Sequence, residues 1–277
     1  MTDHAVSALL AEPRYELLPF MGFEDAIEEL PPGATVSITS SPEKGIDLTV
    51  DRCVEVATDT DLEVVPHLAA RAVRDRDQLE EFVDRFDAAG ITDLFVPGGD
   101  NDEPAGEYAS SYDLLADLDE LGHPFEEIGI TGYPEGHPII DDAALVDALH
   151  AKAPYSTYIV TQICFDPDAV IRWLAEIRQD DIELPVHVGV PGVMKTERMI
   201  GISRKVGVGE SIKFVRKTTG ILGMVKQLVG GKGRYKPDDL VDGLARYYTN
   251  DTYGIAGVHL YTFNEVADCE AWRQSRL

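Results

Sequence analysis

The chain has 277 residues, of which 50 are acidic and 24 are basic, and its formal net charge at pH 7 is −26. An acidic surface of this strength repels nucleic acid and anionic membranes, which argues against both as partners and indicates a high-salt or similarly acidic cytoplasm. The sequence contains no secretory signal and no run of about 18 apolar residues, so we expect a soluble, cytoplasmic protein without a membrane span.

Eight short runs rich in β-branched and aromatic residues recur along the chain, and amphipathic helical patterns fill the intervals between them. In chain order, the predicted strands are residues 14–20, 34–39, 62–67, 93–98, 128–133, 157–162, 185–190 and 257–262. Eight alternating strand and helix units predict the α/β class and a closed parallel (βα)8 TIM barrel, which commonly takes about 250 residues. We therefore expect residues 1–277 to form a single barrel domain.

Local signals place the ends of several predicted helices. Apolar residues recur at helical spacing over residues 47–58 and 76–89, and Gly90 is suited to end the second of these helices. Asp141 is expected to cap a helix that runs to Lys152. Asp166, followed by proline, is expected to cap a further helix over residues 168–178.

The interval between the seventh and eighth predicted strands, residues 192–254, is extended and unusually basic. Residues 195–236, the basic segment, hold eleven of the 24 basic residues and only two acids, Glu197 and Glu210. The basic residues are Lys195, Arg198, Arg204, Lys205, Lys213, Arg216, Lys217, Lys226, Lys232, Arg234 and Lys236. One interpretation is an anion site, because barrels often bind phosphate with the loops after strands seven and eight. The other is ion pairing, either to the acidic body of the protein or to another subunit.

Polar residues stand at the C-terminal ends of most predicted strands, where barrel enzymes have their active sites. They are Glu16, Thr39, His67, Asp100, Tyr133, Gln162 and Tyr261. Glu16 has apolar neighbours, and partial removal from water raises the pKa of a carboxyl, so Glu16 is a candidate general acid. The alternative is that Glu16 forms an ion pair with Arg14 inside the barrel.

Motifs for several other chemistries are missing from the sequence. His67 and His137 belong to no H-x-x-x-H motif or Cys/His pair, so no metal site is predicted. There is no G-x-S-x-G, P-loop or G-x-G-x-x-G motif. The three cysteines are widely spaced, which argues against a disulfide framework, and Cys164, which follows a predicted strand, is expected to be a small core residue.

The order of the strand-end motifs resembles the methylenetetrahydrofolate reductase family. The most specific matches are Gly132-Tyr-Pro-Glu-Gly-His-Pro138 and Thr161-Gln-Ile-Cys-Phe-Asp166. The other matching stretches are Glu16-Leu-Leu-Pro19, Val36-Ser-Ile-Thr39, Pro66-His67, Gly98-Gly-Asp100, Val190-Pro-Gly-Val193 and His259-Leu-Tyr-Thr-Phe-Asn264. The resemblance implies a catalytic domain alone, without a regulatory domain. It also implies an oxidoreductase of one-carbon metabolism and methionine biosynthesis, which interconverts 5,10-methylenetetrahydrofolate and 5-methyltetrahydrofolate using NAD(P)H through non-covalent FAD.

The resemblance further implies roles for individual residues. Glu16 matches the general acid that helps open the imidazolidine ring of the folate, and Asp100 matches a catalytic acid that tunes flavin and folate electrostatically. Gln162 matches the residue that contacts the pterin, and Tyr261 matches a tyrosine of the folate site. The implied flavin contacts are Thr39, His67, Gly99, Asp100, Tyr133 and His137, with Lys152 near the flavin phosphates.

Three departures from the family pattern leave alternatives open. Gly98 and Glu265 each stand where the family usually has arginine, and Leu17-Leu-Pro-Phe20 replaces paired aromatics and prolines. The alternatives are a flavin-independent reductase, an enzyme that oxidises methyltetrahydrofolate, and a non-catalytic subunit that binds folate or flavin. The basic segment could compensate for the lost arginines by binding pyrophosphate or the folate glutamates. The choice of NADH or NADPH, the physiological direction and the formation of a homo-oligomer are also left open.

Overall fold

The computed structural model describes residues 2–205 and 233–277. Within these ranges, eight parallel strands form one sheet in the order β3-β2-β1-β10-β7-β6-β5-β4. A parallel bridge between His67 and Phe95 joins β3 to β4, so the sheet curls into a nearly closed barrel. The strands are β1 (Arg14–Leu17), β2 (Thr35–Ile38), β3 (Glu63–Pro66), β4 (Asp93–Phe95), β5 (Glu127–Gly132), β6 (Tyr158–Thr161), β7 (Val186–Pro191) and β10 (Ile255–Tyr261). Each overlaps a predicted run, which confirms the (βα)8 barrel.

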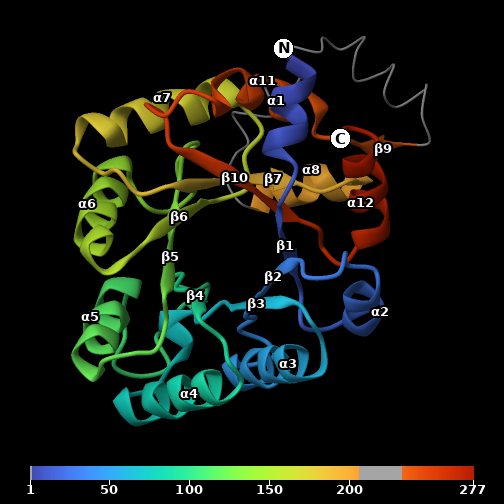
Figure 1. The fold of residues 1–277 in the computed structure, drawn as a ribbon. Helices are drawn as coiled ribbons and strands as arrows, with labels where there is room; N and C mark the ends of the chain where they lie inside the picture. The colour runs from blue at the N-terminus through green and yellow to red at the C-terminus, as the bar shows by residue number, and fades with distance from the viewer. Residues whose placement is uncertain (1, 206–232) are drawn as a thin grey trace.

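Helices surround the strands on the outside of the barrel (Figure 1). They are α2 (Phe23–Glu28), α3 (Ile46–Asp59), α4 (Arg76–Ala88), α5 (Ser111–Leu121), α6 (Asp142–Lys152), α7 (Pro167–Gln179), α11 (Asp238–Tyr248) and α12 (Val266–Gln274). A further helix, α1 (Thr2–Leu9), precedes β1 and packs against α11. The predicted caps are confirmed, since the carboxylates of Asp141 and Asp166 accept from the backbone of the first turns of α6 and α7.

The segment between β7 and β10 departs from a simple helical unit. A short antiparallel hairpin pairs β8 (Met194–Lys195) with β9 (Arg234–Tyr235), and α8 (Thr196–Lys205) follows β8. Five residues of the basic segment lie outside the described residues, namely Lys213, Arg216, Lys217, Lys226 and Lys232. In the described ranges, no helix combines the length and apolar character needed to cross a membrane.

A polar group occupies the N-terminal end of the barrel interior, at the starts of β1, β4 and β6. Arg14 Nη1 lies 2.7 Å from Asp93 Oδ2, and the Tyr158 hydroxyl donates to Asp93 Oδ1 at 2.7 Å. The Arg14 guanidinium also lies 4.2 Å from the centroid of the Tyr158 ring. Arg14 is therefore paired with Asp93 and not with Glu16, contrary to the alternative considered from the sequence. Above this group, Val65, Phe95, Tyr158 and Val160 form an apolar cluster.

Candidate active site

Glu16 lies near the C-terminal end of β1, and its side chain contacts that of His259 on the neighbouring strand β10. Glu16 Oε2 lies 3.1 Å from His259 Nε2, and the Glu16 side chain is only 12% exposed. Burial raises the pKa of Glu16 to about 7, and the nearby His67 opposes this shift. A carboxyl with this pKa still holds much of its proton at neutral pH, which suits a general acid.

Two neutral histidines flank this carboxyl. The centroid of the His67 ring, just after β3, lies 6.2 Å from that of His259 and 4.6 Å from that of Phe95. Burial lowers the pKa of His67 to about 4 and that of His259 to about 3, and the positive charge of Arg14 adds to the second shift. Both rings are therefore uncharged at pH 7, so Glu16 is the group of this cluster that can release a proton near neutrality.

The same three side chains are close enough to share an ion. One donor atom each from Glu16, His67 and His259 lies within 4.8 Å of the others. They come from β1, the end of β3 and β10, so ligand spacing along the sequence could not reveal the group. The absence of a metal site was expected only from the spacing of histidines and cysteines along the sequence. This expectation stays a prediction.

Hydrogen bonds among β10, β7 and β6 fix the other side of this site. The Tyr261 hydroxyl donates to the carbonyl of Thr161 at 3.0 Å, and the Thr161 hydroxyl accepts from the Gly189 N–H at 2.8 Å. A Cβ at Gly189 would lie 2.8 Å from the Tyr261 ring, so only glycine at this position leaves room for the ring. Burial raises the pKa of the Tyr261 phenol, and the charge of Glu16 adds to the shift. Gln162 directly follows β6, and its Oε1 accepts from the next backbone N–H at 2.8 Å.

Residues just after β10 hold the end of β1 in place. Thr262 Oγ1 donates to the Glu16 carbonyl at 2.6 Å. The Asn264 amide accepts from the Leu18 N–H at 2.8 Å and donates to the carbonyls of Leu18 and Phe20 at 3.0 and 2.9 Å. Asn264 has φ 65°, a left-handed conformation that asparagine adopts more readily than most residues. Sequence reasoning matched this stretch to the family but missed that it positions the backbone of Glu16.

A second group lies at the ends of β4 and β5. The rings of Tyr133 and His137 meet edge to face, with centroids 5.3 Å apart. Burial raises the pKa of Tyr133, and the carboxylate of Asp100 adds to this rise. Burial lowers the pKa of His137, and Asp100 opposes that change. The exposed Asp100 therefore places its charge beside both rings, and Tyr133 in turn affects the pKa of Tyr261.

Arg71 shapes the loop that carries Gly99 and Asp100. Its Nε donates to the carbonyl of Asn101 at 2.9 Å, and its Nη2 donates to the next carbonyl at 2.7 Å. Gly99 has φ 94°, and a Cβ there would lie 3.1 Å from the side chain of Ala69, so both backbone and space favour glycine. Arg71 was not predicted as a site residue, since no strand-end position marks it.

Two residues that the resemblance assigns to flavin carry buried polar atoms that suit a ligand. Thr39 Oγ1 and His67 Nε2 are both buried, and neither has a hydrogen-bond partner in the described part of the chain. Buried polar atoms are normally hydrogen-bonded, so an unpaired donor and acceptor at the strand ends fit a bound polar molecule. The residues present are therefore compatible with a flavin at this end of the barrel.

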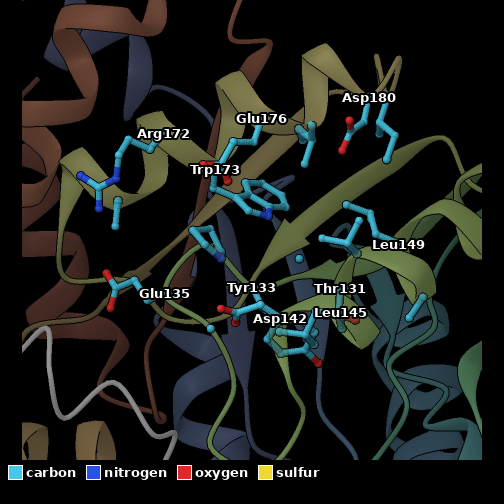
Figure 2. A pocket seen from close by; sticks show the side chains of 18 of the residues that line it. Thr131, Tyr133, Glu135, Asp142, Leu145, Leu149, Arg172, Trp173, Glu176 and Asp180 are labelled. Atoms are coloured by element: carbon cyan, nitrogen blue, oxygen red, sulfur yellow. The ribbon is translucent and has the colours of Figure 1, made fainter.

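A pocket of about 490 Å³ lies between α6 and α7 and reaches the end of β5. Figure 2 shows Trp173 of α7 together with Tyr133 and Glu135 around this pocket. Lys152 also lines it, and its Nζ donates to Thr131 Oγ1 at 3.1 Å. Burial lowers the pKa of Lys152 to about 8. The structure thus places Lys152 in a pocket that shares Tyr133 with the strand-end group.

Comparison with known proteins identifies the family. A family model described as methylenetetrahydrofolate reductase matches residues 24–271. The chain belongs to the methylenetetrahydrofolate reductase family. Methylenetetrahydrofolate reductase (NADH) 1 of Arabidopsis thaliana is 25% identical over an alignment of 176 residues that covers 57% of this chain and 28% of that protein. Methylenetetrahydrofolate reductase 2 of Saccharomyces cerevisiae is 25% identical over an alignment of 144 residues that covers 50% of this chain and 22% of that protein. The matched region spans less than a third of either relative.

Glu265, a departure from the methylenetetrahydrofolate reductase pattern, has basic partners within the chain. Its Oε1 lies 3.1 Å from Arg198 Nη1, and its Oε2 lies 3.2 Å from Arg234 Nη2. Arg234 also contacts Asp268. Arg198 and Arg234 of the basic segment therefore form ion pairs with the acidic body of the protein.

Proposed function

We propose that this protein is a methylenetetrahydrofolate reductase that interconverts 5,10-methylenetetrahydrofolate and 5-methyltetrahydrofolate with electrons from NAD(P)H. The observation that carries the proposal is the buried carboxyl of Glu16, whose pKa is raised to about 7. Opening the imidazolidine ring needs a proton donor, and a carboxylic acid that stays protonated near neutrality can supply the proton. Membership of the family supports the folate as substrate.

In the proposed mechanism, Glu16 gives its proton to the ring nitrogen that leaves the methylene carbon. The carbon–nitrogen bond breaks, and the electron pair of the other ring nitrogen forms an iminium at that carbon. Gln162 and Tyr261, at the ends of β6 and β10, would hold the pterin beside Glu16. The neutral His67 would leave the proton on the carboxyl because it is the weaker base.

A non-covalent FAD, when bound, would pass hydride from NAD(P)H to the iminium carbon. We propose that the flavin is held at the strand ends by the residues whose placement suits it, with Lys152 toward its phosphates. These residues are Thr39, His67, Gly99, Asp100, Tyr133 and His137. The unpaired Thr39 Oγ1 and His67 Nε2 support this assignment, because a flavin offers hydrogen-bond partners for both.

The proposal is tested by an absorption spectrum and an NAD(P)H oxidation assay on the purified protein. We expect flavin bands in the visible spectrum, and NAD(P)H oxidation that depends on methylenetetrahydrofolate. Folate-dependent oxidation without bound flavin would instead identify a flavin-independent reductase. Binding of folate or flavin without turnover in either direction would identify a non-catalytic subunit and overturn the proposed activity.

Asp100 provides a test of the flavin position. A negative charge beside the ring opposes formation of anionic reduced flavin, so Asp100→Asn is expected to raise the reduction potential of the bound flavin and to disturb folate turnover. The potential can be measured by reductive titration against a reference dye. The exposed Asp102→Asn, in the same loop, is the matched control and should leave the potential near that of the parent. A potential unchanged by Asp100→Asn would place Asp100 away from the ring.

A further inference from the structure

The contact between Glu16 and His259 allows two proton arrangements. His259 Nε2 lies 3.1 Å from Glu16 Oε2, and either group can be the donor. If Nε2 carries the ring hydrogen, it donates to Oε2, and the acid proton of the neutral carboxyl sits on Oε1. If Nδ1 carries the ring hydrogen, the acid proton is engaged between Oε2 and Nε2. Only the first arrangement leaves the acid proton facing away from the histidine.

The surroundings of His259 favour the first arrangement. His259 Nδ1 is buried and has no partner in the described part of the chain. Without a hydrogen, Nδ1 is an acceptor that lacks a partner. With a hydrogen, Nδ1 would be a buried N–H donor that lacks a partner, which is rare in proteins. Arg14, the register partner of His259 on β1, adds a positive charge that disfavours a second proton on the ring. The ring is therefore neutral, with its hydrogen on Nε2.

The second oxygen of the Glu16 carboxyl, Oε1, is free of hydrogen bonds to the described residues. Among the described residues, the Glu16 side chain makes its hydrogen bond through Oε2 alone, and the nearby His67 Nε2 accepts none. The titratable groups that face Glu16 are His67, His259 and Tyr261, with Arg14 two residues earlier on the same strand. None of these holds Oε1, which leaves that oxygen for a substrate.

We propose that His259 is a positioning residue for the general acid: it donates Nε2–H to Glu16 Oε2 and so keeps the acid proton on Oε1, where a substrate nitrogen can take it. The proposal rests on the proposed function of Glu16 as proton donor. His259 gains and loses no proton in this role. It differs from His67, which the resemblance assigns to the flavin, because its Nε2 bonds to the acid itself.

Nitrogen-15 NMR of the histidine rings tests the tautomer directly, with no activity needed. At pH 6 and in the full-length protein, the signal that disappears in His259→Gln should show the pattern of a neutral ring with hydrogen on Nε2. His187 is the matched control, because it also has a buried, unpaired Nδ1 and a pKa lowered to about 3, although its side chain is only partly buried. A neutral ring with hydrogen on Nδ1, or an imidazolium, at His259 would overturn the proposal.

Kinetics of two substitutions test the role in positioning. His259→Leu removes the donor, and we expect folate reduction to slow by about tenfold or more through misplacement of the acid proton, with the KM for NAD(P)H unchanged. The pH at which folate reduction falls should also move upward, since a carboxylate that loses a hydrogen bond has a higher pKa. His259→Gln keeps an N–H donor near the position of Nε2 and should retain most of the rate. His187→Gln should resemble the parent.

The outcomes separate this proposal from the proposed function. Equal losses in His259→Leu and His259→Gln, with an unshifted pH profile, would mean that His259 only fills space and would overturn its positioning role. If the parent protein shows no folate-dependent oxidation of NAD(P)H, the proposed function fails. The tautomer measured by NMR would still decide how His259 contacts Glu16.

Discussion

Replacing Glu16 with glutamine is expected to slow the reduction of methylenetetrahydrofolate by at least ~10²-fold, the usual contribution of a general acid. Glutamine has nearly the same shape and can still accept a hydrogen bond from His259, but it has no acid proton to give to the leaving nitrogen. Reduction of the bound flavin by NAD(P)H does not use this proton and should keep its rate. Stopped-flow measurements of the two half-reactions separate the two effects.

The pH dependence supplies an independent check on the same residue. Because the pKa of Glu16 is raised to about 7, folate reduction should decline as the pH rises through 7 and the acid loses its proton. This decline should be missing from the residual rate of Glu16→Gln. The exposed Glu28→Gln on α2 is the matched control and should behave as the parent. Equal folate reduction in Glu16→Gln and the parent would remove Glu16 from the mechanism.

Removal of metal distinguishes proton donation by Glu16 from binding of a metal ion by Glu16, His67 and His259. If Glu16 acts as a proton donor, dialysis against a chelator should leave folate reduction unchanged. Loss of the rate on dialysis, with recovery on adding a divalent metal, would show that the three side chains hold an ion. The proton-donor mechanism would then be wrong.

The strands could be located from the sequence because each is a short β-branched run between helical patterns. Residues 157–162 were predicted as a strand, and β6 spans Tyr158–Thr161. His67, the last residue of the third predicted run, lies just past β3 and forms the bridge that closes the barrel. The hairpin of β8 and β9 could not be predicted, since two residues per strand are too few to show an alternating pattern.

Only one rule allowed the candidate site to be predicted from the sequence: the C-terminal ends of parallel strands lie together at one end of a barrel. That rule brought Glu16, His67 and Tyr261 into one group, and the structure places them together. His259 was missed, although it stands two residues before Tyr261 and so shares its side of β10. The contact of Arg14 with Asp93 crosses from β1 to β4, and nothing in the sequence specifies a pair across the barrel.

Replacing Asp93 with alanine is expected to lower the free energy of unfolding by about 3–5 kcal/mol, the cost of breaking a buried ion pair by removing one partner. Arg14 and Asp93 are 14% and 17% exposed, so the change would leave a guanidinium largely out of water without its counter-charge. It would also remove the acceptor of the Tyr158 hydroxyl. Urea denaturation at fixed pH and salt measures the loss.

The exposed pair of Arg52 with Glu24 is the matched control, because its N–O distance of 2.6 Å is close to the 2.7 Å between Arg14 and Asp93. Glu24 is 66% exposed, so water solvates the charges that Glu24→Ala leaves behind, and the expected loss is at most about 1 kcal/mol. Because the contact distances are nearly equal, the difference between the two variants reflects the burial of Arg14 and Asp93, the lost Tyr158 contact, and the second partner, Glu55, that Arg52 keeps. Equal losses in Asp93→Ala and Glu24→Ala would mean that water reaches Arg14 at the N-terminal end of the barrel. That end would then be open, and the polar group below the apolar cluster would contribute little to stability.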